Sequence, residues 1–177
     1  MVNTLYNYEG FDKDIKEAFQ AIIEQYHLKF KRVGEGRYEL SNGKCIIRFV
    51  YDRGDVGVLL KNPKDNEDEF GNDVAMIFKY LHPELDEYEG IEYNPRRQLI
   101  DEATKCTYLG NILNGDFTWM PGFLYELKKS TALIRYIKNE LDLDNPIYLQ
   151  FMADDPSWFE NIEQYIKINN IDISGYM

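Results

Sequence analysis

The stretch "YELSNGKCIIRFVYDRGDVGVLL", residues 38–60, decides the fold, because two glycine turns divide it into strand-like segments. The pair Asn42-Gly43 is the strongest short hairpin signal, since a type I′ turn requires positive φ at both central residues. We expect this turn to join a strand at 37–41 to a strand at 44–52. The sequence therefore predicts antiparallel pairing at this point of the chain.

The strand predicted at 44–52 is apolar on both faces. Successive side chains of a strand point to opposite faces, so one face carries Cys45, Ile47, Phe49 and Tyr51, and the other carries Ile46 and Val50. This pattern is typical of a central strand covered on two sides.

Further strands flank this pair. The segment "LKFKRV" at 28–33 alternates apolar and basic residues, and the segment "DVGVLLKNP" follows the turn Arg53-Gly54 and ends at Pro63. Together these segments predict an antiparallel meander of three to four strands.

Helical periodicity dominates the rest of the chain. Asn94 and Pro95 are a typical N-cap and first helical residue, and Ser157 with Glu160 matches a capping box. The run "NPIYLQFM" at 145–152 is compatible with a strand or with a short helix. Apolar residues recur at spacings of three and four in the segments 11–28, 71–85, 94–115, 121–141 and 158–170.

This order of elements predicts the fold class. We expect an α+β protein with an N-terminal helix, the antiparallel meander, and a helical C-terminal half packed on the sheet. The chain contains no repeat, low-complexity tract or obvious linker, so we expect a single α+β domain over residues 1–177.

The charge is unevenly distributed along the chain, whose net charge is −11. Residues 65–92 carry ten acids and one base, a net charge of −9, and residues 140–177 carry eight acids and one base, a net charge of −7. The two remaining segments, 1–64 and 93–139, have net charges of +2 and +3. This distribution disfavours nucleic acid and anionic membranes as main ligands, and it favours a cationic partner.

The N-terminal sequence and the cysteine content bear on the cellular location. "MVNTLYNYEG" lacks the basic and apolar regions of a signal peptide, and no apolar run reaches the roughly 20 residues that span a bilayer. The only two cysteines, Cys45 and Cys106, do not have disulfide-framework or zinc-site spacing. We therefore expect a cytoplasmic protein that does not interact with membranes and has two buried thiols.

Catalytic and metal-binding patterns are missing from the sequence. An EF-hand alignment that begins at Asp65 places Phe70 at the glycine position and Met76 at the terminal glutamate position. No serine lies in a nucleophile elbow, and no glycine-rich phosphate loop occurs. We expect the two histidines, His27 and His82, to be structural. The sequence thus predicts a protein that is not an enzyme and needs no metal or cofactor.

Arg96 and Arg97 are unusual because they lie in the first turn of a predicted helix, where the helix dipole disfavours cations. We interpret them as ion-paired with Glu89 or Glu92, in preference to an anion site.

The acidic segment is the main candidate site. Carboxylates steer the encounter with a basic protein, and tyrosines supply rigid contact area, although the same composition also suits a solvated surface. The candidate partner-binding residues are Asp65, Glu67, Asp68, Glu69, Asp73, Glu84, Asp86, Glu87, Tyr88, Glu89, Glu92 and Tyr93.

With its N-terminal helix, its meander over "YELSNGKCIIRFVYDRGDVGVLL" and its acidic, aromatic-rich composition, the chain resembles the small immunity proteins of bacterial polymorphic toxin and contact-dependent inhibition systems. The resemblance implies a cytoplasmic, non-catalytic protein that binds and blocks a cognate toxin domain. Two alternatives stay open: a structural or adaptor domain with no inhibitory role, and a hydrolase with an unrecognised carboxylate site.

Overall fold

The computed structural model describes residues 8–65, 70–85 and 94–177. The chain divides into two compact units, Met1–Thr118 and Trp119–Met177. The first unit contains an N-terminal helix and an antiparallel sheet, and the later part of the chain is helical, so the α+β prediction is confirmed. That the two units belong to the single domain expected over residues 1–177 stays a prediction.

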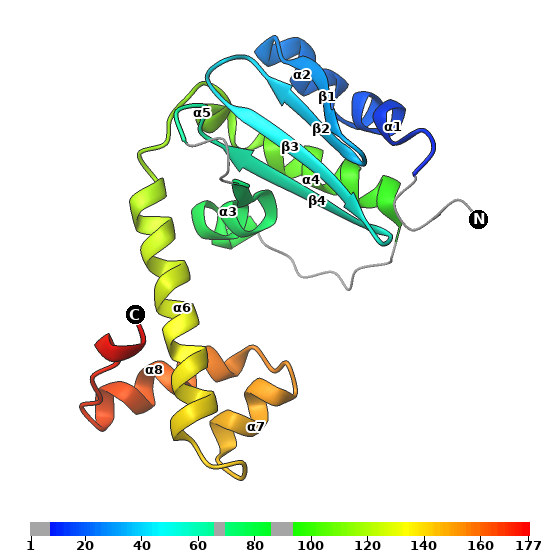
Figure 1. The fold of residues 1–177 in the computed structure, drawn as a ribbon. Helices are drawn as coiled ribbons and strands as arrows, with labels where there is room; N and C mark the ends of the chain where they lie inside the picture. Colours follow the sequence, from blue (N-terminus) through cyan, green and yellow to red (C-terminus); the bar gives the residue numbers. More distant parts are fainter. Residues whose placement is uncertain (1–7, 66–69, 86–93) are drawn as a thin grey trace. The chain divides into compact units, whose positions relative to one another are not determined.

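A five-stranded antiparallel sheet forms the centre of the first unit (Figure 1). The predicted meander is confirmed, and its central strand β3 has neighbours on both sides. Beyond the meander, β5 pairs with β4 and is a polar two-residue strand without the alternating pattern of the other strands. The strands, in the order β1-β2-β3-β4-β5, are β1 (Lys29–Gly34), β2 (Arg37–Ser41), β3 (Ile46–Asp52), β4 (Asp55–Lys61) and β5 (Asn72–Asp73).

The turn between β2 and β3 differs from the type I′ turn expected at Asn42-Gly43. Only Gly43 of the pair has positive φ, and four residues separate the two strands. The reason lies in the side chain of Asn42, whose Oδ1 accepts hydrogen bonds from the backbone N–H groups of Lys44 at 2.9 Å and Cys45 at 3.0 Å. These bonds fold the loop around the amide, so Asn42 stays outside the left-handed region.

The conformation expected at Asn42-Gly43 occurs instead in the next turn. Arg53 and Gly54 have φ values of 52° and 95°, and the flanking residues Asp52 and Asp55 are paired across the strands. Two central residues with positive φ match the right-handed twist of the strands that they join. The β3–β4 hairpin is therefore a tight two-residue turn.

The sheet buries one face. On that face Phe49 is completely buried, and its ring packs edge-on against Phe19 with 4.8 Å between centroids. On the opposite face Arg48 donates two hydrogen bonds to Glu39, at 2.7 and 3.0 Å, and its neighbours Ile46 and Val50 are only half-buried. The expectation that β3 is covered on two sides was therefore wrong, because its second face carries an ion pair and half-buried side chains instead of core residues.

Helices cover the buried face of the sheet. The helix expected at 11–28 is interrupted at Phe19, and α4 begins where Asn94 accepts hydrogen bonds from two backbone N–H groups, as predicted. Both α3 and α4 contact β4, and α4 also contacts the first two helices. The helices of this unit are α1 (Phe11–Ala18), α2 (Gln20–Tyr26), α3 (Val74–Leu81), the 3₁₀ helix η1 (Pro83–Leu85), α4 (Pro95–Thr107) and α5 (Gly110–Leu113).

Arg96 is ion-paired, but with acids other than those expected. Its guanidinium lies 3.4 Å from Asp14 and 3.4 Å from Glu17, both on α1. Glu89 and Glu92 lie outside the described residues. These contacts compensate the cation in the first turn of α4 and join that turn to the N-terminal helix.

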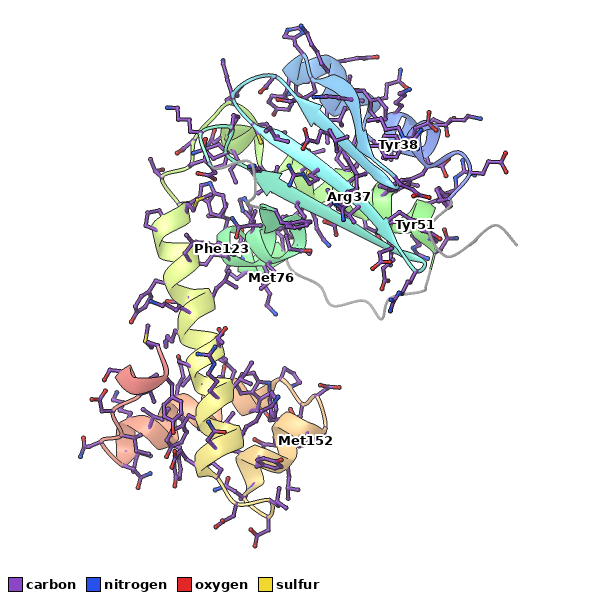
Figure 2. The ribbon with its side chains drawn as sticks, viewed as in Figure 1. Arg37, Tyr38, Tyr51, Met76, Phe123 and Met152 are labelled. Carbon is purple, nitrogen blue, oxygen red and sulfur yellow. The ribbon has the colours of Figure 1, made fainter. Side chains whose placement is uncertain are left out.

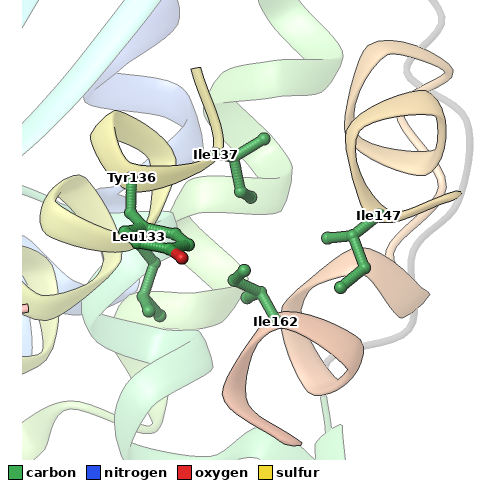
Figure 3. Packing of buried hydrophobic residues seen from close by; sticks show 5 residues of the cluster. All are labelled: Leu133, Tyr136, Ile137, Ile147 and Ile162. Atoms are coloured by element: carbon green, nitrogen blue, oxygen red, sulfur yellow. The ribbon is translucent and has the colours of Figure 1, made fainter. Parts of the chain in front are cut away.

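The second unit is a small helical bundle. It contains α6 (Met120–Glu140), α7 (Pro146–Met152), α8 (Ser157–Ile168) and the 3₁₀ helix η2 (Ser174–Tyr176). The ambiguous run at 145–152 is therefore helical, with Asn145 as its N-cap. Figure 3 shows the core of this unit, in which Leu133, Tyr136 and Ile137 of α6 meet Ile147 of α7 and Ile162 of α8.

The capping box expected at Ser157 does not form. Asp155 instead accepts hydrogen bonds from the backbone N–H and the hydroxyl of Ser157, at 3.0 and 2.6 Å.

Among the described residues, no helix combines the length and the apolar character needed to cross a bilayer.

Replacing Phe49 by Ala should lower the free energy of unfolding by about 3–5 kcal/mol, because it leaves a cavity beside Phe19 in a closely packed core. Val50→Ala is the matched control, since its side chain lies one residue away on the half-buried face. Urea denaturation of both variants measures the difference. A loss below about 1 kcal/mol for Phe49→Ala would contradict the assigned core.

Candidate functional site

The structure describes three of the twelve predicted partner-binding residues. Asp73 precedes α3, Glu84 lies in η1 beyond the other end of that helix, and Asp65 lies in a turn after β4. Asp73 and Glu84 therefore flank one helix, and Asp65 is separate from it. The other nine lie outside the described residues: Glu67, Asp68, Glu69, Asp86, Glu87, Tyr88, Glu89, Glu92 and Tyr93.

The helix between these acids exposes apolar side chains. Met76 is 48% exposed and Tyr80 is 38% exposed, and their spacing of four residues places them on one side of α3. Leu85, 43% exposed, follows in η1. We use the name α3 surface for Met76, Tyr80, Leu85 and Tyr108 together with the carboxylates of Asp73 and Glu84; Figure 2 shows Met76 on α3.

Asp73 fixes the beginning of the α3 surface. Its carboxylate accepts a hydrogen bond from the backbone N–H of Met76 at 3.2 Å, as an N-cap does. The buried side of the helix carries Val74, Ile77 and Phe78. The core side and the cap together hold Met76 and Tyr80 toward solvent.

Aromatic contacts fix the other end of the α3 surface. His82, Phe78 and Tyr108 form a cluster in which the His82 ring centroid lies 5.6 Å from that of Phe78 and 6.0 Å from that of Tyr108. The His82 Nε2 lies 3.3 Å from the backbone carbonyl of Tyr108. Its Nδ1 lies 3.6 Å from the Glu84 carboxylate. His82 thus connects the end of α3 to the end of α4, consistent with the structural role expected for it.

Phe70 is a second exposed aromatic residue in the acidic segment. Its ring is 56% exposed, and the guanidinium groups of Arg37 and Arg48 lie 5.7 and 6.0 Å from its centroid. Arg48 also donates a hydrogen bond to the Phe70 carbonyl at 3.4 Å. Cations over an aromatic face attract it, so these contacts and the hydrogen bond place Phe70 against the face of the sheet that carries Arg37 and Arg48.

The hydrolase alternative depends on carboxyl groups with perturbed pKa values, and Glu102 of α4 is the relevant group. Burial raises the pKa of Glu102, the carboxylates of Asp73 and Asp101 raise it further, and Lys105, whose Nζ lies 2.7 Å away, lowers it. The Glu102–Lys105 pair lies within α4, and Glu102 lines neither the cavity beside the first two helices nor the cavity between the loops after β2, β4 and α5. In these two cavities it therefore cannot serve as the raised-pKa carboxyl group that acid–base catalysis requires.

The two thiols do not fit a nucleophile. Cys45 and Cys106 are both buried, and burial raises the pKa of Cys45 to about 12 and the pKa of Cys106 further still. A thiol with a raised pKa is protonated at neutral pH and reacts poorly. Within the part of the chain that the structure describes, no three His, Cys, Asp or Glu side chains group as a metal site would need.

One cavity lies between the first two helices and β1. It has a volume of about 510 Å³, an apolar lining from Ile23, Leu28 and Phe30, and charged side chains at its rim. Four of the rim charges are paired, since Lys16 lies 3.9 Å from Asp12 and Lys13 lies 3.7 Å from Glu17. Lys16 also lies over the Phe30 ring. The compensated rim gives this groove no preference for one charge.

Sequence reasoning missed the apolar members of the α3 surface and Phe70, because it weighed only acids and tyrosines. The signal for Met76 and Tyr80 was available in the helical pattern at 71–85, where both fall outside the apolar stripe of Val74, Ile77 and Phe78.

Comparison of the chain with protein-family models, curated proteins and solved structures finds no match.

Glu102→Gln should make folding less dependent on pH. A carboxyl group whose pKa is raised in the folded state stabilises the fold below its unfolded pKa of about 4.3, and this stabilisation is lost as the pH rises through the folded value. The free energy of unfolding of the native chain should therefore fall, relative to that of Glu102→Gln, as the pH rises above about 4.3. Parallel curves for the two proteins would contradict this assignment, and Glu35→Gln in an exposed turn is the control.

Proposed function

We propose that this chain is a non-catalytic, inhibitory protein that binds a basic protein partner, such as a toxin domain, through the acidic segment at 65–93. The α3 surface is the observation that carries the proposal. Apart from Tyr108, it lies within the most acidic segment of the chain, and it combines exposed methionine, tyrosine and leucine side chains with flanking carboxylates. Protein interfaces commonly have this composition, with apolar and aromatic anchors at the centre and charge at the rim.

The two parts of this surface have different roles in binding. The net charge of −9 over residues 65–92 attracts a cationic partner over distances comparable to the Debye length, about 8 Å at physiological salt. Met76 and Tyr80 then supply short-range contact area, which must be broken before the complex can dissociate. Charge should therefore govern the association rate, and the apolar side chains should govern the dissociation rate.

Two features of the structure favour binding over the alternatives. A structural or adaptor domain would use the acidic segment for solvation alone, and the exposed apolar side chains of α3 favour binding over that role. A hydrolase would need convergent carboxyl groups in a cleft, whereas Glu102 pairs with Lys105 on the same helix. We therefore favour the binding function, and a cytoplasmic location and the resemblance to immunity proteins belong to the same proposal.

The apolar part of the proposal is tested with matched methionines. With a basic partner isolated from the native host, Met76→Ala combined with Tyr80→Ala should weaken binding by about 2 kcal/mol or more, because exposed anchors lose their contact area. Met152→Ala is the control, since Met152 is 61% exposed in the second unit (Figure 2). Calorimetry measures the affinities. Equal affinities for the native chain and the double variant would assign α3 to the solvated surface.

The electrostatic part is tested by neutralising Glu84, Asp86, Glu87 and Glu89 together as Gln or Asn. We expect slower association and a weaker dependence of the association rate on salt, because the steering charge is lost. A well-folded variant that associates at the native rate would exclude this segment as the binding site. The matched control neutralises four acids of the other acidic segment: Asp142, Asp144, Asp154 and Asp155.

A further inference from the structure

A pocket of about 560 Å³ lies in the first unit, where three loops meet. One loop follows β2, the second follows β4, and the third follows α5. Its volume is within the usual range for small-molecule sites, roughly 300–1,000 Å³. The side chains that line it include Lys44, Asn62, Lys64, Asn114, Phe117 and Thr118, and we use the name loop pocket for this cavity.

The first wall of the loop pocket is held by Asn42. Its Nδ2 donates hydrogen bonds to the carbonyls of Tyr26 and Leu113, at 3.1 and 2.9 Å, while its Oδ1 accepts from Lys44 and Cys45. Gly115 is in close contact with the same loop, since a Cβ there would lie 3.3 Å from the Lys44 Cβ. The β2–β3 loop and the α5–α6 loop are therefore fixed against each other.

The other two walls are held by short side-chain bonds. The Asn62 Oδ1 accepts a hydrogen bond from the backbone N–H of Lys64 at 3.1 Å, which makes the turn after β4. Asp116 accepts hydrogen bonds from the backbone N–H and the hydroxyl of Thr118, at 3.0 and 2.6 Å. A pocket whose walls are already fixed loses little conformational entropy when a ligand binds.

The lining of the loop pocket suits an anion. Two lysines, Lys44 and Lys64, are among the lining residues, and within the described residues neither is in an ion pair with a carboxylate. Asp116 is adjacent, but its carboxylate already accepts the bonds from Thr118, which lower its pKa. The amides of Asn62 and Asn114 add hydrogen-bond donors, and Phe117 adds an apolar wall.

We propose that the loop pocket binds a small phosphate monoester with a planar apolar group, of the size and chemistry of a nucleoside monophosphate. The phosphate lies between the ammonium groups of Lys44 and Lys64, because lysine binds phosphate as a point charge. The planar group lies against Phe117, where stacking on an aromatic face stabilises a base. Lys64 directly precedes Asp65, where the acidic segment begins, but no described residue of that segment lines the loop pocket, and the proposal does not depend on the protein-binding function.

The test uses AMP and inorganic phosphate as probes for calorimetry with the full chain at low salt. AMP should bind more tightly than phosphate, and Lys44→Ala and Lys64→Ala should each weaken AMP binding by about tenfold or more. Phe117→Leu should weaken AMP binding while leaving the affinity for phosphate unchanged. The controls are Lys29→Ala and Lys31→Ala, which remove exposed lysines of β1 and should leave AMP binding unchanged. Thermal melts verify that each variant is folded.

Two outcomes would overturn the proposal. One is a lack of AMP binding to the native chain at about 1 mM, the weak end of the affinities considered specific. The other is native affinity in a folded Lys44→Ala/Lys64→Ala variant, which would place any bound nucleotide elsewhere. Equal affinity for AMP and phosphate would overturn the assignment of Phe117 as the wall for the planar group.

Discussion

The half-buried amide of Asn42 is the interaction on which the first unit depends most. It forms four hydrogen bonds to backbone groups, which belong to the end of α2, the end of α5 and the loop between β2 and β3. Both carbonyls that it satisfies lie at helix ends, where the last turn leaves acceptors without intrahelical partners. One side chain thus aligns the sheet with two helices, and no hydrophobic contact has the direction needed to do the same.

Much of the fold follows from local sequence patterns. Alternation and turn residues predicted the four long strands, and the spacing of apolar residues predicted the longer helices. What they could not predict depends on tertiary contacts. The turn at Asn42 departs from type I′ because its amide accepts bonds from its own loop while it donates to distant carbonyls, and β5 is too polar and short to have a pattern. Its one sequence signal is Gly71, whose φ of 97° brings its backbone so close to Leu60 that a Cβ there would lie 2.7 Å from the Leu60 carbonyl oxygen.

The candidate site was predictable only in part. Charge counting identified the acidic segment, but it could not show that Asp73 is a helix cap or that Glu84 lies beside His82. Nor could it show that Phe70 lies against two arginines of the sheet, because their separation of 22 and 33 residues is bridged only in the folded chain. The loop pocket is an extreme case, since three loops far apart in sequence contribute to it.

The two margins of the sheet have a consequence for how any protein can engage it. Within the described part of the chain, β1 has a neighbouring strand only on its β2 side, and the exposed side chains of Lys29, Lys31 and Arg32 give this margin a high positive charge. At the other margin β5 has only two residues and leads directly into α3. Short or lysine-rich margins discourage a foreign strand from continuing the backbone ladder. The sheet is therefore protected from edge-to-edge aggregation, and a partner must recognise side-chain surfaces instead of extending the sheet.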